Sequence, residues 1–252
     1  VTGCAGRMGK MLCQAVIEAG LELSGGTERP ESPVIGQELG KGKVFADIKE
    51  LFAVSDAVLD FTAPAASVAN AKAAAETGKV LVIGTTGLTE AQRAEVAKAA
   101  EKAPIVLAPN MSVGVNLLQA LVEKVASILD PAYDIEIVEM HHRNKVDAPS
   151  GTALALGKAA AKGRGESLDK VACYERHGVI GARPAGEIGF ATLRGGDVVG
   201  DHTVIFAGTG ERIELTHKAS SRAVFANGAV RAALWAAGQK AGLYSMRDVL
   251  GF

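Results

Sequence analysis

The sequence predicts an α/β protein, with a doubly wound parallel sheet and a second, α+β domain built on a mixed or antiparallel open sheet. Two patterns support this fold class. Through the first ~110 residues, short apolar runs alternate with helix-forming stretches, which is typical of a parallel sheet with helices on both faces. From residue 134 onward, polar and apolar residues alternate one by one, as expected of strands with one solvated face.

Turn, cap and stop residues divide the first region into its elements. Pro64 suits the first turn of a helix that Gly78 ends, and Thr89 with Gln92 forms a capping box at the start of another helix. Residues 1–2 are interpreted as the end of a first strand. The other expected elements are a helix that stops at Gly20, strands at 21–27, 57–61, 79–83 and 104–108, helices at 65–77 and 89–102, and an irregular loop at 30–42.

The second region begins with an apolar-periodic helix at 113–128. A last helix at 225–239 is expected to return to the first domain. Between them we expect strands at 134–141, 189–194, 203–206 and 212–216, and a helix at 151–162. The predicted domains are therefore residues 1–112 with 222–252, and residues 113–221.

The composition is that of a globular protein without extreme charge. Of 252 residues, 48% are hydrophobic and 22% are charged, and the net charge of −1 argues against a nucleic-acid-binding surface or a polybasic membrane anchor. No apolar run approaches the ~20 residues of a membrane span. The three cysteines have no metal-ligand spacing, which predicts no metal site and favours a reducing cytoplasm.

A glycine-rich turn, G-x-x-G-x-x-G over residues 3–9, joins the first strand to the first helix. Glycines here allow a tight turn and let the backbone approach a pyrophosphate, which predicts a Rossmann-like dinucleotide-binding domain. In such folds an acidic residue ~20 positions later binds the adenosine ribose. Glu28 occupies that position, and the adjacent Arg29 suits a 2′-phosphate, so NAD and NADP both remain open. The alternative is that Glu28 and Arg29 are a solvated pair at the end of a strand and bind no cofactor.

More cofactor-binding residues are expected where the parallel strands end, because ligands bind at the carboxyl edge of such sheets. The residues at these strand ends are Phe61, Gly84, Thr85, Thr86, Ala108, Pro109, Asn110 and Met111.

A cluster of cationic and titratable residues follows the strand at 134–141. Backbone N–H groups at a helix start bind anions, and histidines exchange protons near neutral pH. The cluster is therefore a candidate site for binding carboxylates and transferring protons, and an ordinary histidine pair beside a helix N-cap is the alternative. Its members are His141, His142, Arg143, Lys145, Ser150, Gly151 and Thr152.

The stretch Glu139-x-His141-His142-Arg143-x-Lys145-x-Asp147-Ala148-Pro149-Ser150-Gly151-Thr152 resembles the signature of the 4-hydroxy-tetrahydrodipicolinate reductase family, formerly called dihydrodipicolinate reductases. The resemblance spans essentially the whole chain. Two positions depart from it, since Ala63 stands where many members have Arg, and Met111 where many have an aromatic residue. The other matching segments, in the family's order, are residues 3–9, 61–62, 84–87, 110 with 112, 189–190 and 225–229.

This resemblance implies that 4-hydroxy-tetrahydrodipicolinate is reduced to tetrahydrodipicolinate by NADH or NADPH, in the pathway to diaminopimelate and lysine. It further implies a homotetramer built through the second domain, which would bind the substrate. His141 would act as proton donor and acceptor, and Lys145 as proton donor. The role of Arg143 stays open, with substrate binding and a structural ion pair as the two alternatives. The substrate carboxylates would be held by His142, Ser150, Gly151 and Thr152, and the cofactor by Gly3, Cys4, Ala5, Gly6, Arg7, Met8, Glu28, Arg29 and the eight strand-end residues.

Three other functions compete with this one. The nearest is another two-domain dehydrogenase, such as one that acts on homoserine or aspartate semialdehyde. An aspartate semialdehyde enzyme needs a catalytic cysteine, and Cys173 has no adjacent histidine or helix start to activate it. A sensor that binds NAD(P)H without chemistry remains open, and it would tolerate loss of the proton-transfer residues. A metal hydrolase is rejected because adjacent strand histidines point to opposite faces. The remaining histidines, His177, His202 and His217, are expected to be structural or solvated, and Trp235 is expected in the core.

Overall fold

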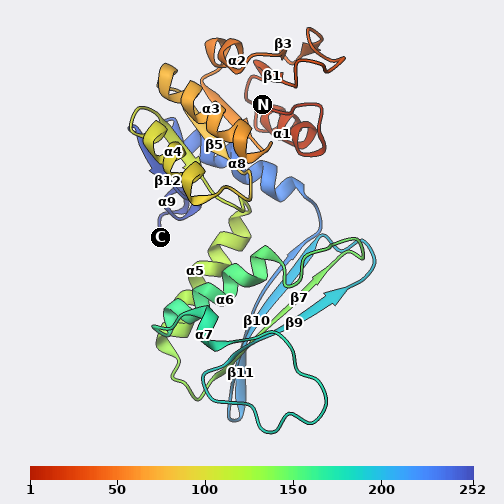
Figure 1. Cartoon of the computed structure of the whole chain (residues 1–252), viewed down its shortest axis with the longest axis vertical. Helices are drawn as coiled ribbons and strands as arrows, with labels where there is room; N and C mark the ends of the chain where they lie inside the picture. The colour runs from red at the N-terminus through yellow and green to blue at the C-terminus, as the bar shows by residue number, and fades with distance from the viewer. The chain divides into compact units, whose positions relative to one another are not determined.

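The computed structural model describes residues 1–252, which divide into two compact units (Figure 1). The first unit comprises Val1–Val113 and Ala223–Phe252, and the second comprises Gly114–Arg222. These limits lie one residue beyond the boundaries drawn from the sequence. No helix is both long and apolar enough to cross a membrane.

The first unit is built on parallel strands. One sheet has the order β12-β6-β5-β4, and a smaller sheet has the order β1-β3-β2. Thr2 lies between them, because its N–H donates to Leu59 O at 3.0 Å and it forms a parallel bridge with Thr27, as expected for the end of a first strand. The strands are β1 (Gly25–Thr27), β2 (Glu38–Leu39), β3 (Gly42–Phe45), β4 (Ala57–Asp60), β5 (Val80–Ile83), β6 (Pro104–Leu107) and β12 (Gly242–Tyr244).

Helices cover both faces of the larger sheet, which confirms the doubly wound architecture. Val80 and Val82 of β5 pack into a cluster with α1, α8 and α9, whereas Leu81 and Ile83 pack into a second cluster with α2, α3 and α4. This division follows from the two-residue repeat of a strand. The helices are α1 (Arg7–Glu18), α2 (Ile48–Val54), α3 (Pro64–Thr77), α4 (Glu90–Ala100), α8 (Ala223–Ala236) and α9 (Met246–Leu250).

Cap residues fix the helix ends as expected, but some short elements differ from the prediction. Thr89 and Gln92 form the capping box of α4, and Gly78 ends α3 in a left-handed conformation. The strand expected at 21–27 is paired only over Gly25–Thr27. The loop expected at 30–42 contains β2, which pairs with β3 as a hairpin. The pattern did not predict β3, α2, β12 or α9, because each is too short to show a clear period.

The second unit places helices on one face of a mixed sheet of order β11-β10-β7-β9-β8. β7 pairs antiparallel with β10 and parallel with β9, so the sheet is less antiparallel than the alternating runs suggested. Ile135 and Ile137 face the helices, and β7 alternates buried and partly exposed residues along its whole length. The elements are α5 (Val113–Ile128), β7 (Asp134–His141), α6 (Gly151–Gly163), α7 (Leu168–Val171), β8 (Ala172–Cys173), β9 (Ile188–Arg194), β10 (Gly200–Gly208) and β11 (Glu211–Ala219).

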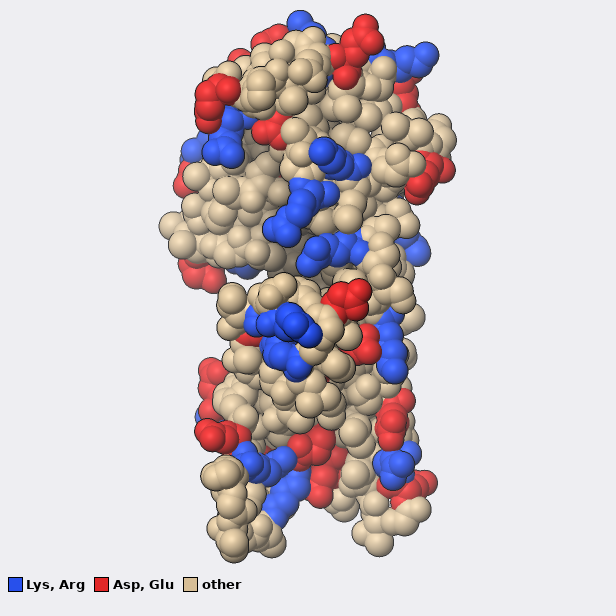
Figure 2. Space-filling model, turned by 90° about the vertical axis from the view of Figure 1, so that its right-hand side faces the viewer, with Lys and Arg blue, Asp and Glu red and all other residues tan.

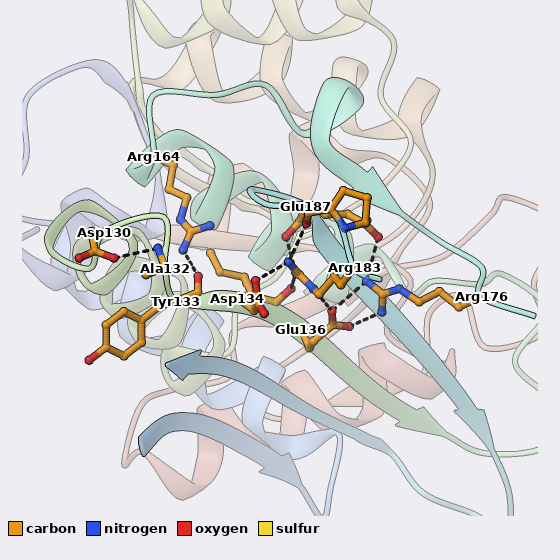
Figure 3. Close-up of polar contacts among 11 residues, drawn as sticks. Asp130, Ala132, Tyr133, Asp134, Glu136, Arg164, Arg176, Arg183 and Glu187 are labelled. Atoms are coloured by element: carbon orange, nitrogen blue, oxygen red, sulfur yellow. Dashed lines mark hydrogen bonds and ion pairs between the residues drawn. The ribbon is translucent and has the colours of Figure 1, made fainter. Parts of the chain in front are cut away.

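Two arginines fasten the irregular segment between β8 and β9 to the start of β7 (Figure 3). Arg183 donates to Asp134 Oδ1 at 2.6 Å and to Glu136 Oε1 at 3.0 Å. Arg176 adds a bidentate pair with Glu136, at 2.8 and 2.9 Å, and a bond to Glu187. On the face drawn in Figure 2, acidic and basic side chains of this unit are interspersed, as the net charge near zero suggests.

Candidate active site

Three strands of the second unit bring polar side chains together at the carboxyl end of β7. Because side chains alternate along a strand, Glu139 and His141 lie on the helix-covered face of the sheet. The strand register then places His202 of β10 opposite Glu139, and Arg194 of β9 opposite His141. The sheet itself therefore assembles this cluster.

Glu139 is the buried centre of the cluster, with 1% of its side chain exposed. Its carboxylate accepts hydrogen bonds from Arg194 at 2.8 and 2.9 Å, from Nδ1 of His141 at 2.6 Å and from the N–H of Ser150 at 3.0 Å. Burial raises the pKa of Glu139, but the bonds from Arg194, His141 and Ser150 outweigh it, so the pKa lies below its ordinary value. The carboxylate is therefore ionised and can only accept.

His141 is consequently held with one nitrogen committed and one free. Since Glu139 accepts, Nδ1 of His141 must donate, which leaves Nε2 to take up or release a proton. A Cβ at Gly200 would lie 3.0 Å from Nε2, so glycine at that position leaves room beside it. Burial lowers the pKa of His141, and nearby Lys145 and Arg194 lower it further, whereas Glu139 opposes them. The neutral imidazole is thereby favoured at neutral pH.

Lys145 lies in the loop that follows β7. Its Nζ donates to both carboxylate oxygens of Asp147, at 2.7 and 2.8 Å, and this contact lowers the pKa of Asp147. The loop is fastened to the β9–β10 connection, because His142 N–H donates to Val198 O at 2.7 Å. Arg143 is exposed and forms no ion pair, so a structural role for it has no support. His142 itself is partly exposed.

The start of α6 is the candidate anion-binding part of the site. Ser150 caps this 13-residue helix by accepting from the N–H of Ala153 at 3.1 Å. Gly151 and Thr152 follow in the first turn, where the helix dipole favours a negative charge. Gly151 is exposed, and the space beside its Cα is open.

His202 is a member of the cluster that the sequence did not identify. It is 4% exposed, its ring lies edge-on to that of His141 with centroids 5.0 Å apart, and burial lowers its pKa to about 4. Arg194 and Gly200 were missed as well. Alternation within each strand could have shown that these residues share a face, but only the register shows that they meet.

The first unit carries the expected cofactor-binding residues, beginning with the glycine-rich turn. Gly3 has a φ of 58°, and a Cβ at Gly9 would lie 2.0 Å from Gly3 O, so both positions require glycine. Gly6 begins α1 without a side-chain cap, which leaves the first-turn N–H groups available to an anion. Glu28 lies beside this turn and accepts the N–H of Ala5 at 2.9 Å. A dinucleotide pyrophosphate and ribose fit these groups.

The other residues of the first unit that are expected to bind the cofactor differ in how exposed they are. Cys4 is buried, Met8 is partly buried, and Arg7 is exposed. Arg29 is exposed as well, 4.0 Å from Glu31. Other exposed or partly exposed members of the set are Gly3, Ala5, Gly6, Glu28, Phe61, Gly84, Thr86, Pro109 and Asn110.

The strand-end residues of the first unit gather at one edge of the sheet. Phe61 follows β4 and lies against Gly84 after β5, where a Cβ would meet the aromatic ring at 2.3 Å. Thr62 N–H donates to Oγ1 of Thr85 at 3.0 Å. Ala108 and Met111, after β6, are only 3% and 1% exposed and belong to the core. Met111 therefore offers a ligand almost no surface.

Both units resemble the corresponding parts of one family of known proteins. The family models for dihydrodipicolinate reductase match residues 1–111 (N-terminus) and 114–250 (C-terminus). The 4-hydroxy-tetrahydrodipicolinate reductase of Rhodopseudomonas palustris (strain BisB18) is 55% identical over 260 residues, covering 100% of this chain and 96% of the relative. That of Thiobacillus denitrificans is 54% identical, with 100% and 97% coverage.

A solved structure shows the same likeness in three dimensions. The dipicolinate-bound dihydrodipicolinate reductase of Paenisporosarcina sp. TG-14 is 25% identical and superposes with a TM-score of 0.81, covering 97% of this chain and 95% of the other.

Proposed function

The chain belongs to the dihydrodipicolinate reductase family, and from that premise we propose that His141 and Lys145 supply the proton of its reaction. As a member, it is an NAD(P)H-dependent oxidoreductase that reduces 4-hydroxy-tetrahydrodipicolinate to tetrahydrodipicolinate in diaminopimelate and lysine biosynthesis. The hydrogen bond between Glu139 and Nδ1 of His141, at 2.6 Å, carries the assignment, because it leaves Nε2 free to exchange a proton in a site that also binds anions.

The reaction requires one proton for each turnover. The nicotinamide, when bound, supplies a hydride, and the substrate's hydroxyl group leaves as water, so one further proton enters the balance. Nζ of Lys145, held as an ammonium by Asp147, is positioned as a proton donor, and Nε2 of His141 is positioned to take up a proton and pass it on. Asp147 keeps the ammonium of Lys145 in place until substrate binds.

The substrate is a cyclic dicarboxylate, and the start of α6 suits its charge. We assign its carboxylates to the first-turn groups of Gly151 and Thr152, with His142 and Ser150 beside them. Ser150 contributes chiefly by capping the helix and so aiming those N–H groups. The relative from Paenisporosarcina binds dipicolinate, a ring with two carboxylates, which supports this class of ligand.

The cofactor half belongs to the first unit. The turn at residues 3–8 would hold the pyrophosphate, Glu28 and Arg29 the adenosine ribose, and the strand-end residues the nicotinamide half. NADH and NADPH remain equal candidates, because Glu28 suits a free ribose hydroxyl and Arg29 suits a 2′-phosphate. The first unit is thus the proposed dinucleotide-binding domain, and the second the proposed substrate-binding domain.

The uncovered face of the second unit's sheet supports the proposed homotetramer. Val138, Met140, Leu193 and Ile205 share this face by strand register and are partly or largely exposed. Apolar side chains grouped on an open sheet favour contact with other copies of the chain. Sedimentation equilibrium would give the mass of four chains, and Leu193→Glu would shift the protein to smaller species.

We also propose a cytoplasmic location. Cys4, Cys13 and Cys173 are all free thiols, which suits a reducing compartment. Cys173 is not an activated nucleophile, since its hydrogen bond with Glu187 raises its pKa. This agrees with rejection of an aspartate semialdehyde dehydrogenase.

A coupled assay tests the function. Aspartate semialdehyde and pyruvate are condensed by the preceding synthase, this protein is added with NADH or NADPH, and the nicotinamide absorbance is followed. We expect rapid oxidation, with the ratio of kcat/KM values giving the cofactor preference. A folded protein that binds either cofactor but gives no turnover would contradict the reductase assignment and favour a nucleotide sensor.

A further inference from the structure

We propose that Arg194 is a positioning residue, whose single guanidinium holds both proton-transfer groups, His141 and Lys145, in fixed relation to each other. The inference rests on the proposed function, which assigns those two residues to proton transfer. Arg194 contacts neither residue directly. It acts on His141 through Glu139 and on Lys145 through Asp147.

The first link runs to His141 through Glu139. Nη1 and Nη2 of Arg194 donate to the two oxygens of Glu139, at 2.8 and 2.9 Å. Such a bidentate pair fixes the plane of a carboxylate as well as its position. With that plane fixed, Oε2 faces Nδ1 of His141 and Oε1 faces the N–H of Ser150. The imidazole orientation is therefore set from β9.

The second link runs to the loop that carries Lys145. Nη2 of Arg194 also donates to the backbone carbonyl of Asp147, at 2.7 Å. The carboxylate of Asp147 in turn holds Nζ of Lys145. One guanidinium thus joins the end of β7, the start of α6 and the lysine loop. A lysine at this position has one nitrogen and no planar fork, so it cannot make all three bonds with the same geometry.

The charges around His141 give this role a measurable consequence. Glu139, Arg194, Lys145 and His202 are the titratable or charged groups that face the imidazole from β7, β9, the following loop and β10. The carboxylate of Glu139 favours protonation of His141, while Arg194 and Lys145 oppose it. Neutralising Arg194 should therefore raise the pKa of His141, and neutralising Glu139 should lower it.

The test uses Arg194→Lys, Arg194→Met and Glu139→Gln, with Arg212→Met as the matched control. Arg212 is an exposed arginine of the same sheet whose one ion pair is with Glu214 on its own strand. In the coupled assay we expect kcat of Arg194→Lys to fall about 10–100-fold, as for a small misplacement of catalytic groups, with KM for NADH unchanged. Arg212→Met should match the parent. Added guanidinium at sub-denaturing concentration should restore part of the kcat of Arg194→Met.

Histidine NMR titration of the protein without cofactor or substrate supplies a readout that general loss of structure would not give. The resonance of His141, assigned by its absence in His141→Gln, should titrate at higher pH in Arg194→Met and at lower pH in Glu139→Gln. If Arg194→Met fails to fold, the kcat of Arg194→Lys and the titration of Glu139→Gln decide the question. Folded Arg194 variants with parental kcat, or variants in which the pKa of His141 stays unmoved, would overturn the inference.

Failure of this inference is distinguishable from failure of the proposed function. Turnover by the parent protein establishes the function whatever the Arg194 variants do. An inactive parent removes the function, and an active parent with unaffected Arg194 variants removes only the positioning role.

Discussion

Oγ of Ser150 lies 3.0 Å from Nε2 of His202, joining the start of α6 to strand β10 of the second unit's sheet. The same oxygen caps α6 by accepting from Ala153. One small hydroxyl thus holds the start of α6 against the strand that lies opposite Glu139. Under the proposed function, the position of the substrate carboxylates depends on this contact.

Replacing Ser150 with alanine should therefore weaken both stability and substrate binding. Loss of the cap and of the buried bond to His202 should lower the free energy of unfolding by about 1–2 kcal/mol, and KM for substrate should rise. Urea unfolding and the coupled assay measure the two effects. Ser167→Ala is the matched control, since Ser167 occupies the N-cap of α7 without a side-chain bond. Equal effects of the two substitutions would argue against the role of Ser150.

His202 should make the second unit sensitive to acid. Its pKa is about 4 in the folded protein and 6.5 in the unfolded chain, so the unfolded state binds more protons between these values. Stability should fall as the pH drops from about 6.5 to about 4, with a contribution of about 3 kcal/mol from this residue. Urea midpoints measured across this range should fall less steeply in His202→Asn. His177→Asn, which replaces an exposed histidine, should keep the parental slope. A His202→Asn slope equal to that of the parent would contradict the account.

Gly9→Ala should prevent the glycine-rich turn at residues 3–9 from binding a dinucleotide. The added methyl group would lie 2.0 Å from Gly3 O, so the glycine-rich turn must move away from α1. We expect loss of NADH and NADPH binding by nicotinamide fluorescence and a decrease of about 1–3 kcal/mol in the free energy of unfolding, as for other overpacked sites. Gly238→Ala is the control, because its Cβ would meet no atom closer than 3.8 Å. Normal cofactor binding by Gly9→Ala would show that the pyrophosphate is held elsewhere.

Arg183→Ala should release the segment between β8 and β9. Arg183 is only 20% exposed and bonds Asp134 and Glu136 of β7, so its removal leaves two carboxylates without that partner (Figure 3). We expect faster hydrogen exchange and proteolysis over residues 174–187, with a cost of about 1–3 kcal/mol. Arg212→Ala should cost less than 1 kcal/mol, because its ion pair is solvated. Unchanged exchange in Arg183→Ala would mean that Arg176 alone fastens the segment.

Much of the fold could be predicted because its longer elements carry strong periodic signals and caps. The helix at Val113–Ile128 and the strand at Asp134–His141 agree with prediction to the residue, and the capping box of Thr89 is present. The short strands β3 and β12 were missed, since three or four residues contain too little of a period to be distinguished from a loop.

The candidate site could be predicted only as far as it is local in sequence. His141, Lys145 and Ser150 lie within ten positions, and their chemistry is visible in one stretch. Arg194 and His202 come from strands β9 and β10, and only the register of three strands brings them to Glu139. The sequence predicts only a structural or solvated role for His202, because nothing in its neighbours reveals which residue faces it across the sheet.

The central claim is that His141 and Lys145 transfer the proton of the reaction, and kcat of His141→Gln and Lys145→Ala in the coupled assay tests it most directly. With NADH binding verified by fluorescence in each variant, we predict that kcat falls about 10²–10⁴-fold in both. His177→Gln and Lys158→Ala, which replace exposed residues of the same unit, should keep the parental rate. Variants of His141 and Lys145 that bind NADH and turn over within about threefold of the parent would contradict the claim, since general acid catalysis contributes far more than this.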